Sequence, residues 1–236
     1  MPNVQRMLAN MLVATLLTML AWSGTAKASD DHPDFAYQGE YYGHISFDSE
    51  DEPTTIGMQI AALDDGRFRV LLHHGGLPGM GWDEGDERAE LSAERVDDRV
   101  RVEAYQGITF THENPGLIAR NDAGNVRGTL HHITRTSPTM GKQPPEDAIV
   151  LFDGSNLDRW RDGARIVDGL LAQCPRTAED YGDMYLHLEF KTHLLPGARS
   201  QQRANSGVYI QNRYEVQVLD SFAEPPALQG SGSLYN

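Results

Sequence analysis

The sequence predicts an all-β protein, and three observations lead to this prediction. Short runs rich in valine, isoleucine and aromatic residues recur along the chain, separated by glycine, aspartate and asparagine. Several runs alternate apolar and polar residues with a period of two, the pattern of a strand with one buried face. Convincing amphipathic helices are missing. We therefore expect short antiparallel strands joined by tight turns.

Six β-rich runs predict a small antiparallel front domain, which we place at residues 29–136. They read GEYYGHISF, TIGMQIAAL, RFRVLLHH, RVRVEAY, ITFTHE and VRGTLHHITR. The Asp-Asp-Gly sequence at residues 64–66 is typical of a tight hairpin. A loop at residues 75–87, with several glycines, a proline, a tryptophan and four acids, interrupts the domain.

A proline-rich segment at residues 137–148 has no apolar periodicity and predicts a linker, or a strap across a surface. We place the domain boundary there. A second β-rich domain is predicted at residues 149–236 from the runs IVLFDG, ARIVDGLLAQ, DMYLHLEFKTH, SGVYIQ and YEVQVLD. Asp168 and Gly169 are expected at the tip of a hairpin.

Two of these runs separate apolar from polar side chains. In residues 183–193 the alternation places one set on each face: Met184, Leu186, Leu188 and Phe190 against Tyr185, His187, Glu189 and Lys191. In residues 214–220 it predicts that Tyr214, Val216 and Val218 face a core while Glu215 and Gln217 face away. A two-residue turn at Asn212 and Arg213 would bring Tyr209 and Gln211 near the latter pair.

The polar faces have two interpretations. Antiparallel sheets commonly have one solvated face, so a surface without function is the simpler interpretation. Glutamate, glutamine, tyrosine, histidine and asparagine on neighbouring strands are also able to bind sugar hydroxyls, while aromatic rings stack on the sugar ring. The residue types favour this second interpretation.

The N-terminus predicts export. Arg6 precedes an apolar run at residues 11–22, and Ala26 and Ala28 fit a cleavage site, so we predict a signal peptide at residues 1–28 and a periplasmic or extracellular protein. The run is shorter than the roughly 20 residues of a transmembrane helix. Cleavage removes two basic residues and no acid, so the net charge of −14 becomes −16. This charge argues against nucleic acid or anionic membranes as partners.

The second domain resembles a known bacterial family. The segment IVLFDGSNLDRW at residues 149–160, residues 185–222 with the block NSGVYIQNRYEVQVLDS, and GSLY at residues 232–235 resemble the domain called DUF1080, or 3-keto-disaccharide hydrolase (3-keto-glucoside 1,2-lyase). The resemblance implies a concanavalin A-like jelly roll with a concave, sugar-facing sheet. Residues 66–83 and the linker are similar to the front part of exported, planctomycete-type members.

The sequence also departs from the family pattern. Members continue with the remaining strands of both sheets, so we expect only the first part of the sandwich, truncated at its C-terminal end. Where members tend to carry an Asn-Glu-Cys-Gly-Gly-like segment, this chain reads LQGSGSLYN. Asn212 stands where glycine is common, a substitution that a positive φ permits. Cys174 is the only cysteine and is predicted to be a buried or free thiol.

The chemistry implied by the resemblance is cleavage of 3-keto glycosides, by removal of the C2 proton and elimination at C1, after which water adds. Glu215 is the favoured base, with Glu189 or His187 as the alternative acid or base. The predicted substrate-binding residues are Asn205, Tyr209, Arg213, Gln217 and Asp220. Arg213 or Lys191 would stabilise the oxyanion. Alternatively, Asp220 fixes the turn after its strand, and Asn205 with its two following residues forms only a turn.

Cofactors and rival functions complete the predictions. No dinucleotide-binding fingerprint is visible, so a separate sugar 3-dehydrogenase would supply the ketone. Adjacent histidines at residues 73–74 and 131–132 point to opposite faces, and the acids of residues 83–87 lack an EF-hand pattern, so no metal site is assigned. A divalent cation near Glu189 and Glu215 stays open. The alternative function is a non-catalytic carbohydrate-binding or surface-interaction module, and a retaining glycosidase ranks last.

Overall fold

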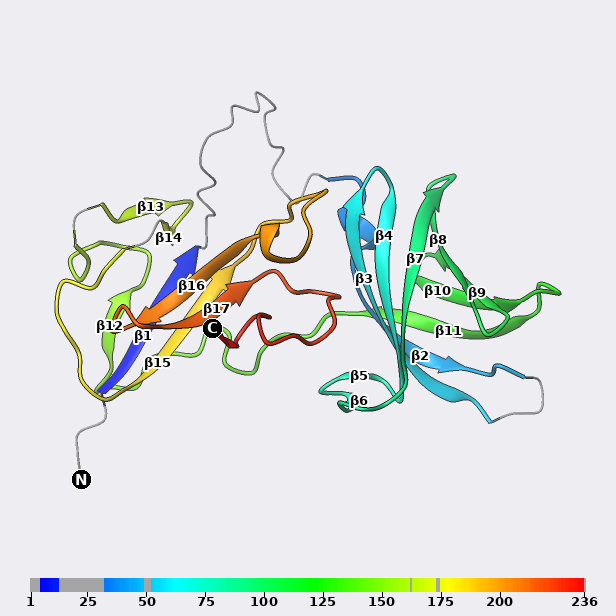
Figure 1. The fold of residues 1–236 in the computed structure, drawn as a ribbon, viewed down its shortest axis with the longest axis horizontal. Coiled ribbons are helices and arrows are strands. Elements are labelled where there is room, and N and C mark those ends of the chain that lie inside the picture. Colours follow the sequence, from blue (N-terminus) through cyan, green and yellow to red (C-terminus); the bar gives the residue numbers. More distant parts are fainter. Residues whose placement is uncertain (1–4, 13–31, 49–51, 162, 173–174, 236) are drawn as a thin grey trace.

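The computed structural model describes residues 5–12, 32–48, 52–161, 163–172 and 175–235 (Figure 1). Nearly all its regular elements are strands, and the only helices among these residues are the 3-10 turns η2 (Phe35–Tyr37) and η3 (Ser200–Gln202). The prediction of an all-β fold is therefore confirmed. None of the described helices is long and apolar enough to cross a membrane.

Eight of the described strands close into an antiparallel barrel, which removes unpaired sheet edges. In spatial order they are β10 (Gly116–Asn121), β11 (Val126–Ile133), β2 (Gly39–Ile45), β3 (Thr54–Asp64), β4 (Arg67–His74), β7 (Arg88–Val96), β8 (Arg99–Tyr105) and β9 (Ile108–Glu113). The six predicted runs of the front domain are all strands, whereas β7 and β10 were not predicted. The Asp-Asp-Gly hairpin is confirmed, with φ of 51° at Asp65 and 71° at Gly66.

Alternate residues of each barrel strand fill its interior. From β3 the buried side chains are those of Ile56, Met58, Ile60 and Ala62, and they pack with Phe68 and Phe110. The turn η2 lies at one end of the barrel. There the fully buried Asp34 accepts hydrogen bonds from the Gly66 amide at 3.0 Å and from Arg95 Nε at 2.7 Å.

The glycine-rich loop covers part of the outer barrel wall. It contains the small strands β5 (Leu77–Pro78) and β6 (Gly81–Trp82). A Cβ atom on Gly57 of β3 would collide with the loop backbone at Gly76, so glycine permits this close approach. Trp82 packs edge-on against His73, with ring centroids 4.9 Å apart.

The two adjacent histidines of β4 lie in different environments. His73 is 1% exposed, and neither ring nitrogen has a hydrogen-bond partner within the described residues. Burial is the largest cause that lowers the pKa of His73, to about 4. His74 instead lies 3.2 Å from the Tyr105 hydroxyl. The expected opposite orientation of this pair is confirmed.

The described residues of 5–12 and 149–235 are called the second region. It contains a sheet in which several strands pair with one central strand. Among the described strands, β1 (Gln5–Leu12) pairs in parallel with β12 (Ile149–Phe152), β14 (Leu170–Ala172) and β15 (Met184–Lys191), and β13 (Arg165–Val167) pairs with β14. The hairpin at Asp168 and Gly169 is confirmed. Of the predicted signal peptide, β1 is the described part, and the rest lies outside the described residues, as does Cys174.

One face of β15 forms the predicted core. Met184, Leu186 and Leu188 pack against a cluster of Leu151, Phe152 and Leu171. The prediction is wrong for Phe190, which is 43% exposed near the end of the strand. The cluster is small, so it covers only part of the face.

A separate three-stranded sheet contains β16 (Asn205–Ile210), β17 (Tyr214–Leu219) and β18 (Leu234–Tyr235). Ile210 pairs with Tyr214, so the turn has three residues and the two-residue prediction is wrong. Gln211 and Asn212 both have positive φ, 56° and 53°. The extra residue places Gln211 within the turn.

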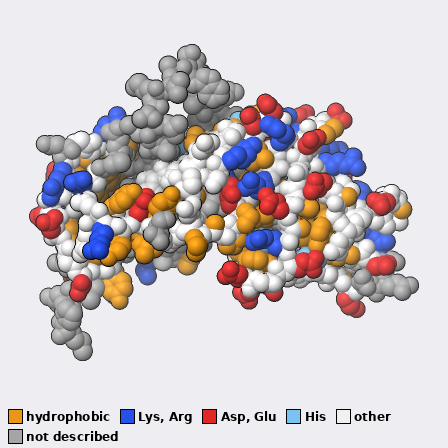
Figure 2. Space-filling view, viewed as in Figure 1, with side chains coloured by type: hydrophobic (Ala, Val, Ile, Leu, Met, Phe, Trp, Pro, Cys, Tyr) orange, Lys and Arg blue, Asp and Glu red, His pale blue; other side chains and the backbone are white. Residues whose placement is uncertain are grey.

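The predicted faces of β17 are partly reversed. Val218 is buried as predicted, but Tyr214 and Val216 are exposed, and Gln217 is only 2% exposed. Val216 is 38% exposed, whereas Gln201 bonds the Gln217 side chain and the backbone of residues 232–233 bonds the Gln217 backbone. Figure 2 shows exposed apolar side chains on the surface of the second region, and side chains of both charges on the surface of the barrel.

Candidate functional site

The sheet of β16, β17 and β18 places a carboxylate between two tyrosines. Tyr209 pairs with Glu215, and Glu215 pairs with Tyr235 on the other side. Residues directly opposite each other on neighbouring strands share a face of the sheet, so the three side chains form one row. We call this row the tyrosine–carboxylate row. Tyr235 was not predicted, because its strand has only two residues.

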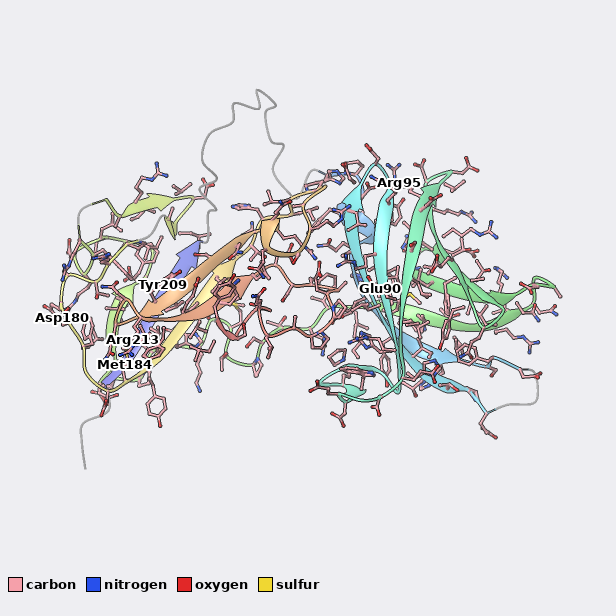
Figure 3. All side chains as sticks on the ribbon, in the orientation of Figure 1. Glu90, Arg95, Asp180, Met184, Tyr209 and Arg213 are labelled. Carbon is pink, nitrogen blue, oxygen red and sulfur yellow. The ribbon has the colours of Figure 1, made fainter. Side chains whose placement is uncertain are left out.

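The row is held by a short hydrogen bond. The Tyr209 hydroxyl donates to Glu215 Oε2 at 2.7 Å, and such bonds to an ionised acceptor are stronger than those between neutral groups. Tyr209 is 61% exposed and Glu215 is half-buried, so the carboxylate is supported yet accessible. Figure 3 shows Tyr209 and Arg213 toward the end of the hairpin that points away from the barrel.

Gly207 provides the space that Glu215 occupies. A Cβ atom at this position would overlap Oε1, Cγ and Cδ of Glu215. Gly207 does not have the positive φ that favours glycine, so the need for glycine here is spatial. The sequence predicted either a strand from residue 206 or a turn at residues 205–207, and the structure places all three residues in β16, so the turn prediction is wrong. A glycine inside a strand is the signal that could have identified a close approach.

Two predicted substrate-binding residues are tied to Gln201 of η3. Gln217 Nε2 donates to Gln201 Oε1 at 2.9 Å, and Asn205 Nδ2 donates to the Gln201 backbone and side-chain oxygens, both at 3.0 Å. The other side-chain atom, Gln217 Oε1, is buried without a partner among the described residues. Gln201 was not predicted, because no periodic pattern connects a 3-10 turn to a distant strand.

Asp220 lies at the other end of the hairpin and pairs with Arg203. Its Oδ2 atom accepts from Arg203 Nη2 at 2.9 Å and from Nε at 3.2 Å, and its Oδ1 accepts from the Phe222 amide at 3.4 Å. These contacts favour the alternative in which Asp220 fixes the turn after its strand. Its contact with substrate stays a prediction.

Arg213 occupies the hairpin turn. Its guanidinium lies over the Tyr214 ring, 5.5 Å from the centroid, which is the geometry of a cation–π contact. The side chain is exposed, and its proposed role at an oxyanion stays a prediction.

Glu189 and His187 form a second polar group on β15. His187 Nε2 lies 3.5 Å from Glu189 Oε1, and the same oxygen accepts a hydrogen bond from the Gly141 amide in the proline-rich segment. That segment therefore contacts the polar face of β15, which also carries Lys191. β15, which carries this group, and β17, which carries Glu215, belong to different sheets.

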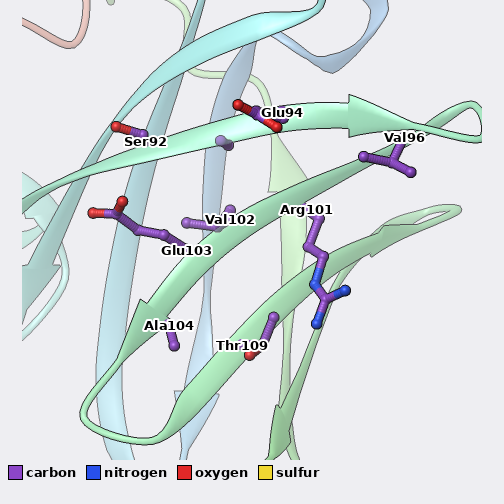
Figure 4. Close-up of a pocket in the computed structure, with 9 residues that line it drawn as sticks. Ser92, Glu94, Val96, Arg101, Val102, Glu103, Ala104 and Thr109 are labelled. Carbon is purple, nitrogen blue, oxygen red and sulfur yellow. The ribbon is translucent and has the colours of Figure 1, made fainter.

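The described residues contain no group of three or more histidine, cysteine or acidic side chains that could hold a metal ion. A hollow of about 310 Å³ lies on the barrel, lined by residues of β7, β8 and β9 (Figure 4). It contains Glu94, Arg101 and Glu103 but none of the predicted site residues. The tyrosine–carboxylate row is therefore the better candidate site.

The described residues form an all-β protein in which the Glu215 carboxylate lies between Tyr209 and Tyr235 on one face of a sheet. Residues 147–236 match the family model of the 3-keto-alpha-glucoside-1,2-lyase-like domain, and this match supports the resemblance seen in the sequence. The matched segment contains all the predicted site residues. Neither a curated protein nor a solved structure matches the chain.

Proposed function

We propose that this protein cleaves 3-keto glycosides, and that Glu215 is the base. The family match carries this proposal, since it covers the segment that contains the tyrosine–carboxylate row. The row adds a reason to choose Glu215 among the acids of that segment. Its carboxylate is oriented by Tyr209, half-buried, and seated in the space that Gly207 leaves for it.

The proposed reaction begins with the ketone at C3, which makes the C2 proton acidic. Glu215 takes this proton, and the electron pair left on C2 forms an enediolate with the C3 carbonyl. The enediolate then expels the glycosidic oxygen from C1, and that oxygen gains a proton from an acid or from water. Addition of water to the resulting double bond completes hydrolysis.

The neighbouring side chains have roles in this proposal that follow from their positions. Tyr209 and Tyr235 flank the carboxylate and offer ring faces to a pyranose. Asn205 is held by Gln201 and would bind a hydroxyl group, whereas Gln217 is buried and would act only by fixing Gln201. Arg213 would stabilise the enediolate oxygen only after leaving its contact with Tyr214, which lies on the face opposite Glu215.

Two further parts of the proposal concern the surroundings. Glu189 and His187 remain the alternative acid or base, and Lys191 the alternative cation. A separate sugar 3-dehydrogenase would produce the substrate, and export would place the reaction in the periplasm or outside the cell.

Replacement of Glu215 tests the proposal directly. The Glu215→Gln variant and the wild-type chain are incubated with 3-keto-trehalose and with trehalose, and circular dichroism checks the fold. We expect the wild type to consume only the keto sugar, and the variant to lose at least about 100-fold in rate, as removal of a general base does. Glu189→Gln is the matched variant on β15. If Glu189→Gln is inactive and Glu215→Gln is active, the base assignment is wrong.

The second candidate function is a non-catalytic carbohydrate-binding module. The exposed Tyr209 and Tyr235 on either side of a carboxylate favour it, because aromatic rings beside hydrogen-bonding groups suffice for sugar binding. Binding of both sugars without consumption of either would support this function and reject the lyase proposal.

A further inference from the structure

A chain of charged side chains connects the barrel to the candidate site. Arg69 projects from the outer face of β4, because its neighbours Phe68 and Val70 are buried in the barrel core. Its Nη1 atom lies 2.5 Å from Glu224 Oε1, and its Nε atom lies 3.3 Å from Glu90 Oε1 on β7. Glu224 therefore ties the second region to the barrel wall.

The series of ion pairs continues from Glu224 into the hairpin of β16 and β17. Glu224 Oε1 also lies 3.4 Å from Nη1 of Arg203, and that nitrogen donates to the Phe222 carbonyl at 2.9 Å. Arg203 is only 4% exposed, and its remaining contacts are with Asp220. A buried guanidinium needs paired carboxylates, so the position of Glu224 affects how Arg203 is held.

Arg203 and Asp220 clamp the open end of the hairpin. Arg203 lies two residues before β16 and Asp220 lies directly after β17, so their ion pair joins the two strands at the end opposite the turn. The Asp220 amide also donates to the Ala204 carbonyl at 2.8 Å. In Figure 1 this open end of the hairpin faces the barrel.

Residues 194–199, which precede β16, make further contacts with the barrel. The Gly197 amide donates to the Leu63 carbonyl at the end of β3, at 2.6 Å. Leu194 packs against the barrel core cluster. Burial and nearby arginines, Arg69 and Arg67 first among them, lower the pKa of Arg199. The acids Glu224 and Asp220 thus compensate a concentration of positive charge at this interface.

We propose that the barrel is a positioning module for the tyrosine–carboxylate row, and that Arg69 is the positioning residue that acts through Glu224 and Arg203. Arg69 holds Glu224, Glu224 holds Arg203, and Arg203 fixes the strands that carry Tyr209 and Glu215. The link to catalysis rests on the proposed function, but the link to the hairpin does not. The barrel therefore contributes to the site without touching the substrate.

Hydrogen exchange of the full chain tests the link to the hairpin. We expect Arg69→Ala to increase amide exchange in β16 and β17 about ten-fold, within the usual range of coupling between sites. Exchange in β9 and β10, on the far side of the barrel, should not change. Arg69→Lys should restore part of the protection. Unchanged exchange in β16 and β17 of Arg69→Ala would overturn the proposal.

Arg67→Ala is the matched control, because Arg67 projects from the same face of β4 but contacts the Asp64 carbonyl and not Glu224. It should leave exchange in the hairpin unchanged, and an equal effect of both variants would reject the specific role of Arg69. If Arg69→Ala disrupts the barrel itself, Glu224→Gln tests the same series of ion pairs by a change in the second region. It should loosen β16 and β17 while the barrel stays protected, and a protected hairpin in this variant would also overturn the proposal.

Turnover of 3-keto-trehalose supplies a readout that general destabilisation does not move. A misplaced carboxylate lowers kcat more than it raises KM, so we expect Arg69→Ala to reduce kcat about ten-fold with little change in KM. Recovery of kcat in Arg69→Lys supports positioning, and a change confined to KM contradicts it. If the wild type shows no turnover, the proposed function fails, while the exchange experiment still decides the structural link.

Discussion

The barrel and the C-terminal sheets are built from similar strands but complete their hydrogen bonding differently. The barrel is closed, and its apolar side chains are enclosed in one large core. The second region has open sheets, a smaller core, and exposed apolar residues such as Val216 and Leu234. The barrel is therefore stabilised by its own contacts, whereas the second region depends on contacts from other parts of the protein.

The contacts that the second region receives come from β1 and from the barrel. Strand β1, from the N-terminal part of the sequence, joins β12, β14 and β15, which do not pair with one another among the described strands. The barrel holds the hairpin through Arg69 and Glu224.

The largest effect is expected in the barrel core. Phe110 is fully buried, so Phe110→Ala should lower the free energy of unfolding of the barrel by about 3–5 kcal/mol through lost burial and a residual cavity. Phe190→Ala on β15 is the matched control and should cost about 1 kcal/mol or less, because that ring is already partly exposed. Urea denaturation measures both. Equal losses would show that the two regions are equally well packed.

Acid should weaken the barrel through His73. Its pKa is lowered to about 4 from an ordinary 6.5, so the unfolded chain binds a proton that the folded chain excludes between these values. The contribution of neutral His73 to the free energy of unfolding is therefore full above about pH 6.5. It is lost as the pH drops toward 4, and amounts to about 3 kcal/mol for a shift of this size. Urea denaturation at several pH values measures the slope.

His73→Leu removes the titrating group and should flatten this part of the pH dependence. The variant separates His73 from His112, whose pKa burial also lowers. An identical slope in the variant and the wild type would exclude His73 as the cause. If the pH dependence of unfolding came from the C-terminal sheets and not from the barrel, the assignment of this effect to the barrel would be wrong.

The sequence predicts the strands well where local pattern and turn chemistry agree. The strand bounds of β4, β8 and β9 coincide with the predicted runs, and Asp-Gly turns identify two hairpins. Strand β7 was missed because its sequence, RAELSAERV, is rich in alanine and glutamate, which have low β propensity. The barrel around it supplies the pairing that its own residues do not favour.

The candidate site could be predicted only in part, because alternation gives the relative faces of a strand but not which face is covered. Alternation correctly separates Glu215 from Val216, and the structure confirms that Tyr209 contacts Glu215. The burial of Gln217 depends on Gln201 and on residues 232–233, which no sequence periodicity connects to β17. Contacts between distant segments of this kind are not encoded in local periodicity.

Strand β1 should determine the order of the second sheet but not that of the barrel. Ala9 pairs with Phe152 and Leu188, and Ala9→Pro removes a backbone donor and leaves a ladder carbonyl without its partner. A loss of about 1–3 kcal/mol corresponds to faster amide exchange in β15 by roughly ten- to a hundred-fold. Exchange of the full chain measures this, with β3 and β4 as the internal reference.

Ala9→Val keeps the N–H group and is the matched control, so β15 should stay protected in it. The same residues lie inside the predicted signal peptide. Unchanged protection of β15 in Ala9→Pro would show that the second sheet does not need β1.

The smallest effect on stability, with a large effect on activity, is expected at Gly207. A Cβ atom there overlaps the Glu215 side chain, which is flexible and half-buried, so Gly207→Ala should move the carboxylate away from Tyr209 at a cost below about 1 kcal/mol. Gly182→Ala is the matched control, because an added Cβ at Gly182 meets nothing within 4 Å. Because misplacing a catalytic group costs far more in rate than in stability, turnover of 3-keto-trehalose should fall by roughly 100-fold in Gly207→Ala alone. Full activity in this variant would mean that the present position of Glu215 beside Tyr209 is not the one used in the reaction, and would direct attention to Glu189 on β15.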